Sequence, residues 1–319
     1  MAGPILVTGA GGFAGSHLVD RLAPDGHDIV AWQRRVADRS GSPSVAAARP
    51  GVAVEYVDVL DAAAVREAVA RARPSVIYHC AGAAHVGRSW NRTETTLSVN
   101  VRGTHHLLEA LRIAGIRARV LVPSSAMVYR PADEPLTEDH PLVPESPYGV
   151  SKLAQELLAC RAMADDIDVA IARSFNHFGP RQDPSFVASA FARQIAEIES
   201  GRREAELVVG NLDARRDLTD VRDTVRAYVM LVERGLAGRP YNVCSGHAVT
   251  VRELLDRMLS RARIRIKIRV DAGRYRPNDV PLVLGDPTRI EREIGWTAEI
   301  PIERTLDDLL EYWRGEMAV

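Results

Sequence analysis

The chain has 319 residues, of which 46% are hydrophobic and 26% are charged, and its formal net charge at pH 7 is −1. These values are ordinary for a globular protein, and they exclude non-specific nucleic-acid binding, which needs a surplus of basic residues. No apolar stretch approaches the roughly 20 residues of a membrane helix, so we expect neither a membrane nor a nucleic acid as partner.

Short apolar runs alternate with helical patterns in the first half of the chain. The sequence predicts strands at 4–8, 28–32, 52–57, 75–80, 119–123 and 169–173, and helices at 13–22, 62–71, 100–114 and 147–165. Strands that alternate with helices predict parallel βαβ units, and therefore an α/β fold with a doubly wound parallel sheet of the Rossmann type. We assign residues 1–173 to this dinucleotide-binding domain.

The pattern changes after residue 173. Residues 174–215 are rich in Gly, Pro, Arg and Asp around a predicted helix at 186–200 and a strand at 207–209. The segment 263–270 alternates Arg or Lys with Ile or Val, which predicts a half-exposed strand rather than a basic ligand-binding patch. We expect 174–215 and 262–319 to form a smaller C-terminal substrate-binding lobe, with 216–261 returning to the first domain.

The start of the chain and its cysteines bear on its compartment. The first predicted strand begins at residue 4, which leaves no room for a signal peptide, and we expect a cytoplasmic protein. Cys80, Cys160 and Cys244 match no metal-ligand or disulfide spacing, so no metal site is predicted. Cys80 lies in an apolar run and is expected to be a buried structural thiol.

A glycine-rich turn lies between the first predicted strand and the first predicted helix. Gly9, Gly12 and Gly15 allow a tight turn and a close approach of the backbone to a pyrophosphate, and Phe13 opens the helix. The helix N-terminus offers free N–H groups to the same anion. Many helices begin with glycines, but the position of this turn in a βαβ unit predicts a dinucleotide site.

The residues that follow the second strand bear on the choice of cofactor. That strand leads into Gln33, Arg34 and Arg35, with no carboxylate to accept a ribose 2′-hydroxyl. Two guanidinium groups would attract a 2′-phosphate, so we expect NADP(H), with NAD(H) as the alternative if these arginines only form a solvated loop. Further cofactor-binding candidates follow the third and fourth strands: Asp58, which would meet the adenine unless it is an ordinary strand end, with Val59 and Ala81.

The predicted helix at 147–165 carries Tyr148 and Lys152, which share one helix face at i and i+4. A nearby ammonium is expected to lower the pKa of the phenol, which favours proton transfer. The chain has 39 arginines and two lysines, so a lysine at this position points to chemistry that a guanidinium does not perform. A plain exposed ion pair with no function is the alternative.

Two polar residues are expected beside this pair. Ser125 ends the fifth strand at the carboxyl edge, where ligands of open α/β sheets bind, and its hydroxyl can bond a substrate oxygen; ending the strand is the alternative role. Asn100 opens the predicted helix 100–114, where it can tie a backbone carbonyl or a water near Lys152, or cap the helix.

Together these residues resemble the extended short-chain dehydrogenase/reductase family that acts on nucleotide sugars. The shared motifs in the N-terminal half are Gly9-x-x-Gly12-x-x-Gly15, Asp58, His79-Cys80-Ala81-Gly82, Asn100-Val-x-Gly103-Thr104, Ser125 and Tyr148-x-x-x-Lys152. The C-terminal half resembles the GDP-mannose-processing branch through Asn176-His177-Phe-Gly-Pro180, Phe186-Val187, Phe191-Ala-Arg193, Arg216-Asp217 and Arg276-Pro-x-Asp-Val280. That branch holds GDP-4-keto-6-deoxy-D-mannose reductases and GDP-mannose 4,6-dehydratases.

The resemblance implies a reaction and a set of substrate contacts. Ser125, Tyr148 and Lys152 would be catalytic, with Tyr148 and Lys152 also touching the cofactor. The candidates for binding a GDP-linked sugar are His85, Met127, Asn176, Val187, Arg193, Arg216 and Arg276. A homodimer built from the helices at 100–114 and 147–165 is also expected.

Met127 distinguishes between the reactions of this family. The dehydratases carry a glutamate two residues after the catalytic Ser or Thr, and a thioether cannot replace its proton transfer. We therefore expect NADP(H)-dependent reduction of the 4-keto group of a GDP-4-keto-6-deoxyhexose, which forms GDP-D-rhamnose. The alternatives are a nucleotide-sugar 4-epimerase with tightly bound NAD, then a GDP-mannose 4,6-dehydratase, and last an inactive dinucleotide sensor, which would not need an intact Tyr–Lys pair.

Overall fold

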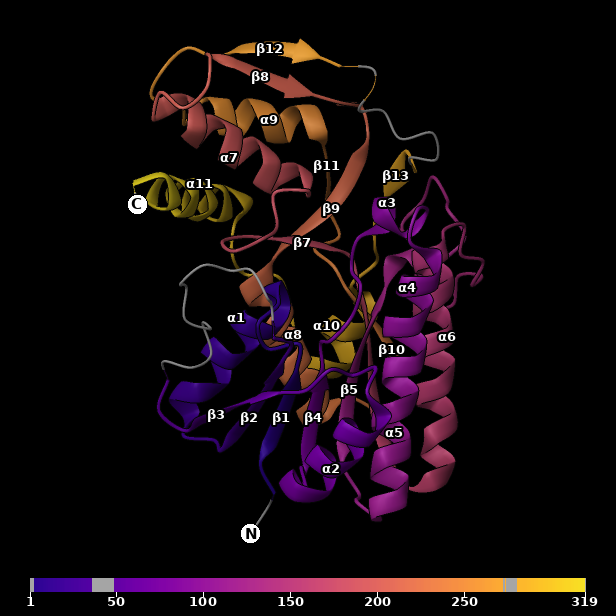
Figure 1. Cartoon of the computed structure of the whole chain (residues 1–319). Coiled ribbons are helices and arrows are strands. Elements are labelled where there is room, and N and C mark those ends of the chain that lie inside the picture. Colours follow the sequence, from indigo (N-terminus) through magenta and orange to yellow (C-terminus); the bar gives the residue numbers. More distant parts are fainter. Residues whose placement is uncertain (1–2, 36–48, 272, 274–279, 319) are drawn as a thin grey trace.

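The computed structural model describes residues 3–35, 49–271, 273 and 280–318, and its largest element is a parallel sheet (Figure 1). Within these residues the sheet has seven strands in the order β10-β6-β5-β4-β1-β2-β3. All pairings in it are parallel, which confirms the predicted doubly wound fold. The strands are β1 (Ile5–Thr8), β2 (Ile29–Gln33), β3 (Val52–Tyr56), β4 (Val76–His79), β5 (Arg119–Ser125), β6 (Asp168–Ser174) and β10 (Pro240–Val243).

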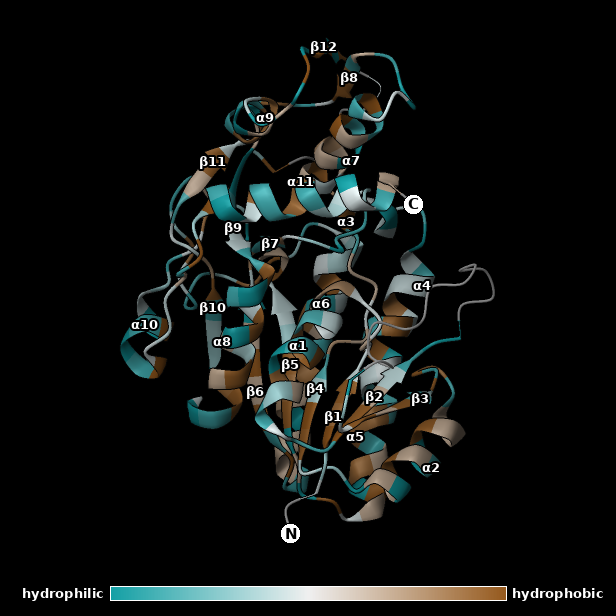
Figure 2. Cartoon of the chain, turned by 90° about the vertical axis from the view of Figure 1, so that its left-hand side faces the viewer, coloured by the Kyte–Doolittle hydropathy of each residue, from teal (hydrophilic) through white to brown (hydrophobic). Residues whose placement is uncertain are grey.

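Helices cover both faces of this sheet, because successive residues of a strand point to opposite sides. Leu6 of β1 packs with residues of α2, α5 and α6, whereas the next residue, Val7, packs with residues of α1 and α8. Figure 2 shows the hydrophobic strands enclosed between helices of mixed hydropathy. These helices are α1 (Phe13–Leu22), α2 (Ala62–Ala72), α5 (Gly103–Ala114), α6 (Pro147–Ala162) and α8 (Val221–Arg234).

Strand β1 lies at the point where the order of the sheet reverses. It pairs with β2 on one side and with β4 on the other, so the loops after β1 and β4 leave the sheet in different directions. Such a reversal opens a crevice at the carboxyl ends of the strands, and open α/β sheets bind their ligands there. The topology therefore places the glycine-rich turn after β1 at this crevice.

A smaller lobe lies above the carboxyl edge of the main sheet (Figure 1). A four-stranded sheet of β7, β9, β11 and β13 and a two-stranded sheet of β8 and β12 pack with three helices around a separate core. None of the described helices is long and apolar enough to span a membrane. The elements are β7 (Asn176–Phe178), β8 (Glu206–Val209), β9 (Arg215–Asp220), β11 (Ala248–Thr250), β12 (Lys267–Val270), β13 (Leu282–Val283), α7 (Val187–Glu199), α9 (Val251–Leu259) and α11 (Ile302–Ala318).

The expected boundaries of the two parts differ from the observed packing at two places. Residues 216–261 were assigned to the first domain, but only α8 and β10 pack there, whereas β11 pairs with β9 and α9 contributes to the core of the lobe. Residues 262–319 were assigned to the lobe, but α10 (Thr288–Ile294) and Trp296 pack against the first domain. The chain therefore crosses between the two parts more often than its pattern indicated.

The expected half-exposed strand at 263–270 is also different. Of this segment, Lys267–Val270 forms a strand, β12, and its partner among the described residues is β8. All four of its residues are exposed, so among the described residues no layer covers either face of this strand. Alternation of charged and apolar residues predicted a buried face that this strand does not have; Ile266, just before it, packs partly on the core of the lobe.

Candidate functional site

The glycine-rich turn after β1 packs tightly against the end of β4. Gly9 has a φ of +66°, and a Cβ atom there would lie 2.6 Å from the Ala81 nitrogen. A Cβ atom at Gly15 would overlap the carbonyl oxygen of Gly9. Gly12 is the N-cap of α1 and contributes no side-chain acceptor, so the first N–H groups of the helix are free for an anion. The structure thus brings Gly9, Gly12, Gly15 and Ala81 together as a cradle that fits a dinucleotide pyrophosphate.

Phe13 and His17 on α1 connect this turn to the lobe. The Phe13 ring stacks on His177, with the ring centroids 5.7 Å apart, and meets His17 edge-on. His17 shares a hydrogen bond of 2.9 Å with the carbonyl of Pro180, and burial lowers the pKa of His17 to about 4. A neutral His17 imidazole that donates its Nε2 proton to the Pro180 carbonyl is consistent with both the hydrogen bond and the lowered pKa. Phe13, expected to bind the cofactor, therefore lies at the junction with the lobe.

The ends of β2 and β3 lie side by side at the far end of the crevice. Gln33 pairs with Tyr56 across the two strands, and a Cβ atom at Gly11 would lie 2.9 Å from the Gln33 Oε1 atom. Arg34 and Arg35 are exposed, and the Arg35 guanidinium lies over the Tyr56 ring, 5.4 Å from its centroid. This end of the crevice offers two cations and a neutral amide beside the glycine-rich turn.

The loop after β3 supplies two further candidates. Asp58 is exposed and accepts a hydrogen bond of 2.9 Å from the Leu60 N–H, which fixes the turn into α2. Val59 is buried against Gly103 of α5, and His106 shares a hydrogen bond of 2.9 Å with the Val59 carbonyl. Both residues lie at the carboxyl end of β3, where the predicted cofactor contacts would be.

Ser125 and Tyr148 meet where β5 and α6 approach each other. Ser125 ends β5, Tyr148 lies in the first turn of α6, and a hydrogen bond joins their side chains. Gly149 makes this approach possible, because any Cβ atom there would overlap the carbonyl oxygen of Met127. Ser89 of α3 (Val86–Ser89) holds the same turn from the other side, since its hydroxyl accepts the Tyr148 N–H at 3.2 Å.

The expected effect of Lys152 on Tyr148 is not observed. Burial raises the pKa of Tyr148, and the only opposing influence identified is the hydrogen bond with Ser125. The buried Lys152 ammonium donates instead to Gln155 Oε1, and burial lowers the pKa of Lys152 to about 8, against the influence of Cys80 and Glu156. The prediction of a lowered tyrosine pKa was wrong because it counted charge but not the loss of hydration.

Asn100 lies inside a helical run rather than at its start. The helix α4 (Thr93–Leu97) continues through a π-helical turn into α5, so the predicted N-cap role of Asn100 is wrong. Its fully buried side chain accepts the Ala83 N–H at 2.7 Å and donates to the Ala83 carbonyl at 3.2 Å and to Ser151 Oγ at 2.8 Å. Asn100 does bind a backbone carbonyl, that of Ala83, and its bond to Ser151 joins it to the residue before Lys152.

Several residues that support this group had no predicted role. Behind Ser125, Ser124 donates to Glu156 at 2.8 Å, and Arg173 binds the same carboxylate. Behind Lys152, Gln155 donates to Thr104, which also bonds His79. His79 and Thr104 belong to the family motifs quoted above, so the sequence contained a signal for them, but Gln155 and Ser89 carried none.

The substrate candidates are more scattered. Val187 and Arg216 line one narrow cavity of about 10 Å³, with Leu218, Val249, Thr250, Val251 and Leu254. Asn176 is exposed on β7, opposite Leu218 of β9, and Met127 lies two residues after Ser125, in the short helical turn Ala126–Val128. The side chain of His85 caps α3, and its ring lies 5.1 Å from that of Phe186, just before α7.

Two candidates do not join this group. Arg193 pairs with Glu197 one turn along α7 at 2.7 Å, and its guanidinium lies over the Trp313 ring. Arg193 is therefore engaged with Glu197 and Trp313 and does not line the cavity that Val187 lines. Arg276 lies outside the described residues.

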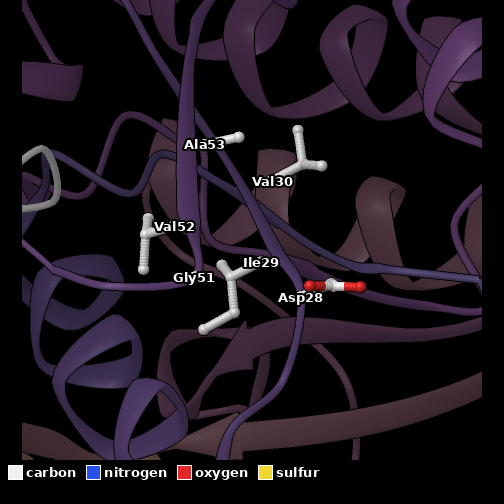
Figure 3. A pocket seen from close by; sticks show the side chains of 6 residues that line it. All are labelled: Asp28, Ile29, Val30, Gly51, Val52 and Ala53. Atoms are coloured by element: carbon white, nitrogen blue, oxygen red, sulfur yellow. The ribbon is translucent and has the colours of Figure 1, made fainter.

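A wider hollow than this cavity lies elsewhere. It has a volume of about 420 Å³ and is lined by Asp28, Ile29, Val30, Gly51, Val52 and Ala53 (Figure 3). These residues form the amino ends of β2 and β3, whereas the glycine-rich turn, Ser125 and Tyr148 lie at the carboxyl ends of their strands. Asp28 is the single charged residue of its lining, so this hollow brings no reactive groups together.

Comparison with known proteins identifies similar chains over the full length. The family described as GDP-mannose 4,6 dehydratase matches residues 6–309. A GDP-6-deoxy-D-mannose reductase of Pseudomonas aeruginosa is 37% identical over 248 residues, which cover 76% of this chain and 82% of the relative. A UDP-glucose 4-epimerase of Mycolicibacterium smegmatis is 32% identical over 318 residues, 98% of each chain.

Among solved structures, RMD from Pseudomonas aeruginosa complexed with NADPH is similar to this chain with a TM-score of 0.84 and 32% identity. The superposition covers 99% of this chain and 100% of that chain. The similarity thus extends over the main sheet and the lobe together.

Proposed function

The chain belongs to the GDP-mannose 4,6 dehydratase family of extended short-chain dehydrogenases/reductases, and from that membership we propose that it uses NADPH to reduce the 4-keto group of a GDP-4-keto-6-deoxyhexose, forming GDP-D-rhamnose. It is a nucleotide-sugar enzyme that uses a nicotinamide cofactor. The observation that carries the finer proposal is Met127, which lies two residues after Ser125, at the position of the dehydratases' glutamate.

In this proposal, Ser125 and Tyr148 act on the keto oxygen. The reduced nicotinamide supplies the hydride. The hydroxyls of Ser125 and Tyr148 are already hydrogen-bonded to each other, so a ketone oxygen placed between them can accept a bond from both. Burial raises the pKa of Tyr148, which keeps the phenol protonated near neutral pH and ready to give its proton to O4. Solvent then returns a proton to the phenolate, which completes the cycle.

Met127 supports reduction over dehydration. Its backbone N–H donates to Ser125 Oγ at 3.2 Å, so the residue is tied to the reacting edge of β5. A thioether at that place holds no transferable proton, and removal of water from the sugar requires one. Reduction of a ketone requires a single proton, which Tyr148 supplies.

The end of β2 supports NADPH as the reductant. Gln33, next to the glycine-rich turn, gives a neutral amide where NAD-dependent Rossmann enzymes use a carboxylate. Arg34 and Arg35 leave their guanidinium groups exposed beside it, and Tyr56 supports Arg35 from below. A 2′-phosphate would form charge-assisted hydrogen bonds with these groups.

A nucleotide-sugar 4-epimerase with tightly bound NAD is the second candidate. The M. smegmatis UDP-glucose 4-epimerase is similar over 98% of both chains, and an epimerase also needs no acid or base at Met127. The cofactor state of the purified protein distinguishes the epimerase from the reductase. NAD that stays bound through purification favours the epimerase, whereas an empty site that binds added NADPH favours the reductase.

The test of the reductase is direct. GDP-4-keto-6-deoxy-mannose, made by a separate GDP-mannose 4,6-dehydratase, is added to the folded protein with NADPH or NADH, and absorbance at the nicotinamide band is followed. The proposal expects oxidation of NADPH and a reduced GDP-sugar product by chromatography. Absence of oxidation with either cofactor would remove the reductase assignment.

We also propose that the protein forms a homodimer through α5 and α6. Ile113, Val150 and Leu157 are large apolar side chains that remain exposed on these helices, and Leu157 is 61% exposed. Two copies of this helix pair would bury them in a four-helix contact. Sedimentation velocity should show a dimer that Leu157→Glu converts to monomer; a monomeric parent protein would contradict the proposal.

A further inference from the structure

A chain of hydrogen bonds leads from the end of β4 to the Lys152 ammonium. The Ala81 N–H donates to Thr8 Oγ1 at 3.1 Å, and Thr8 bonds His79 Nδ1 at 2.9 Å. His79 Nε2 lies 2.9 Å from Thr104 Oγ1, and Gln155 Nε2 donates to the same oxygen at 2.7 Å. The remaining atom of the Gln155 amide, Oε1, accepts the Lys152 ammonium.

The protons in this chain have one consistent arrangement. Thr104 donates its own proton to the Asn100 carbonyl at 2.7 Å, so its oxygen must accept from both Gln155 and His79. His79 then carries its proton on Nε2 and accepts at Nδ1 from Thr8, whose oxygen in turn accepts the Ala81 N–H. This assignment requires a neutral imidazole, and burial lowers the pKa of His79 to about 3.

The arrangement fixes which way round the Gln155 amide lies. Its NH₂ group is used by Thr104, because the Thr104 oxygen has no proton left to donate to the amide oxygen. If the Gln155 amide were turned over, its NH₂ group would face the Lys152 ammonium. Its oxygen would then face the Thr104 oxygen, which has no proton left to donate. The carbonyl oxygen of Gln155 therefore faces Lys152 because Thr104 on α5 donates its proton to the Asn100 carbonyl and accepts both from Gln155 and from His79 at the end of β4.

We propose that Gln155 is the positioning residue of Lys152, and that the Thr8–His79–Thr104 chain sets its amide so that a neutral oxygen holds the ammonium. This inference rests on the proposed function for the role of Lys152 at the cofactor. It goes further by identifying what holds that lysine and what controls its charge.

The titratable groups that surround Lys152 are either neutral near pH 7 or bound to other residues, so Gln155 is the residue that holds the ammonium. From β4, His79 is neutral, and burial raises the pKa of the Cys80 thiol to about 12, so neither is charged near neutral pH. From α6, Glu156 is the nearby anion, and its two oxygens bind Arg173 and Ser124. Tyr148 is protonated, because burial raises the pKa of its phenol as well.

The consequence is a buried lysine whose ammonium is hydrogen-bonded to one amide oxygen. With a pKa of about 8, Lys152 is charged at pH 7 and loses its proton as the pH rises above 8. Removing the acceptor disfavours the ammonium and lowers this pKa, whereas a carboxylate in its place favours the ammonium and raises it.

The experiment compares Gln155→Leu and Gln155→Glu with the parent protein. The affinity for NADPH and for NADH is measured between pH 6 and 10 from the quenching of tryptophan fluorescence, so no sugar substrate is needed. We expect the parent affinity to fall with a midpoint near pH 8, Gln155→Glu to move that midpoint upward by about one unit or more, and Gln155→Leu to move it downward. Gln194→Leu removes another buried glutamine, in the lobe, and should leave the midpoint unchanged.

A second pair of variants tests the hydrogen-bond chain that leads from Thr8 through His79 and Thr104 to Gln155. Thr104→Val removes the hydroxyl at nearly constant volume and frees the Gln155 amide to turn over, so its midpoint should move downward as in Gln155→Leu. Thr104→Ser keeps the hydroxyl and should restore the parent midpoint. This pair also decides the matter if either Gln155 variant fails to fold, as judged by far-UV circular dichroism.

Opposite shifts for the two Gln155 variants support the proposal, because a purely structural role would move both in one direction or neither. Midpoints that do not move, or that move the same way, would overturn it, as would equal midpoints for Thr104→Val and Thr104→Ser. If the shifts appear but the keto sugar is not reduced, the proposed reductase function fails while the positioning role of Gln155 stands.

Discussion

The carboxyl edge of the main sheet and the surface of the lobe use polar residues in different ways. Around Lys152 the polar side chains are buried, and Gln155, Thr104, His79 and Thr8 each bond a partner from another strand or helix. On α7 of the lobe, Arg193 is half-exposed and pairs with Glu197 on its own helix. Buried groups need specific partners, so their residue types are fixed, whereas exposed ion pairs contribute little and tolerate exchange.

The comparison predicts that a substitution at the sheet edge costs far more than one in the lobe. Tyr148→Phe should lower kcat by about 10²- to 10⁴-fold, because it removes the proposed proton donor and keeps the ring. Cofactor affinity should change little, which fluorescence titration can check. A variant that retains turnover would remove the proton-transfer role from Tyr148 and weaken the contrast between the two regions.

The junction between the two regions predicts an effect on stability in acid. The folded protein protonates His17 only near its pKa of about 4, whereas the unfolded chain binds that proton below about 6.5. The unfolded state therefore binds more protons in this window, and stability falls as the pH decreases from 6.5 to 4.

His17→Gln keeps a donor for the Pro180 carbonyl but cannot titrate. The decrease in the free energy of unfolding between pH 6.5 and pH 4 should therefore be smaller in this variant, by up to about 3 kcal/mol. Urea unfolding at pH 6.5 and pH 4.5 measures it, with His247→Gln on the exposed surface as the control. Equal losses in the parent and in His17→Gln would show that the junction does not determine acid stability.

Arg34 and Arg35 at the end of β2 allow a test of whether exposed arginines can still select NADPH over NADH. Replacing Arg34 and Arg35 together by alanine should raise the KM for NADPH by about 20-fold, since charge-assisted hydrogen bonds contribute roughly 1.5–3 kcal/mol. The KM for NADH should change less than twofold. Similar changes for both cofactors would mean that these arginines do not contact a 2′-phosphate.

The smallest effects are expected inside the lobe and sharpen the comparison there. Arg216 donates to the Val280 carbonyl at 2.8 Å and lines the cavity next to Val187, so Arg216→Ala should raise the KM for the GDP-sugar by about tenfold. Arg193→Ala, the matched control, should change it by less than threefold because that guanidinium binds Glu197. Equal effects would contradict the separation of these two arginines.

The sequence predicted the main sheet because its strands are short apolar runs separated by periodic helices. It also predicted Ser125, Tyr148 and Lys152 as a group, since strand order and helical spacing determine where they lie. It did not predict the raised pKa of Tyr148, because burial depends on packing from α3 and β5. The same limit applies to β12, whose alternating pattern does not reveal that no layer covers it.

The partners of Lys152 could not be derived from local patterns for a related reason. Gln155 follows Lys152 by three residues on α6, and a glutamine at a helical position carries no functional signal by itself. Its role depends on contacts with Thr104 of α5 and His79 of β4. Arg193 shows the opposite case, since an arginine inside a family motif binds other side chains and does not line the cavity. Contacts between distant segments decided both outcomes.

The hydrogen-bond chain behind Lys152 also has a consequence for how the protein folds. Its members, from Thr8 to Gln155, come from β1, β4, α5 and α6 and are joined by contacts between residues up to 73 positions apart. Contacts of such high sequence separation form late, after loop closure has been achieved. Thr8 and His79 are also paired across β1 and β4, so this hydrogen-bond chain forms together with the sheet and not before it, and cofactor binding should appear only when the sheet is complete.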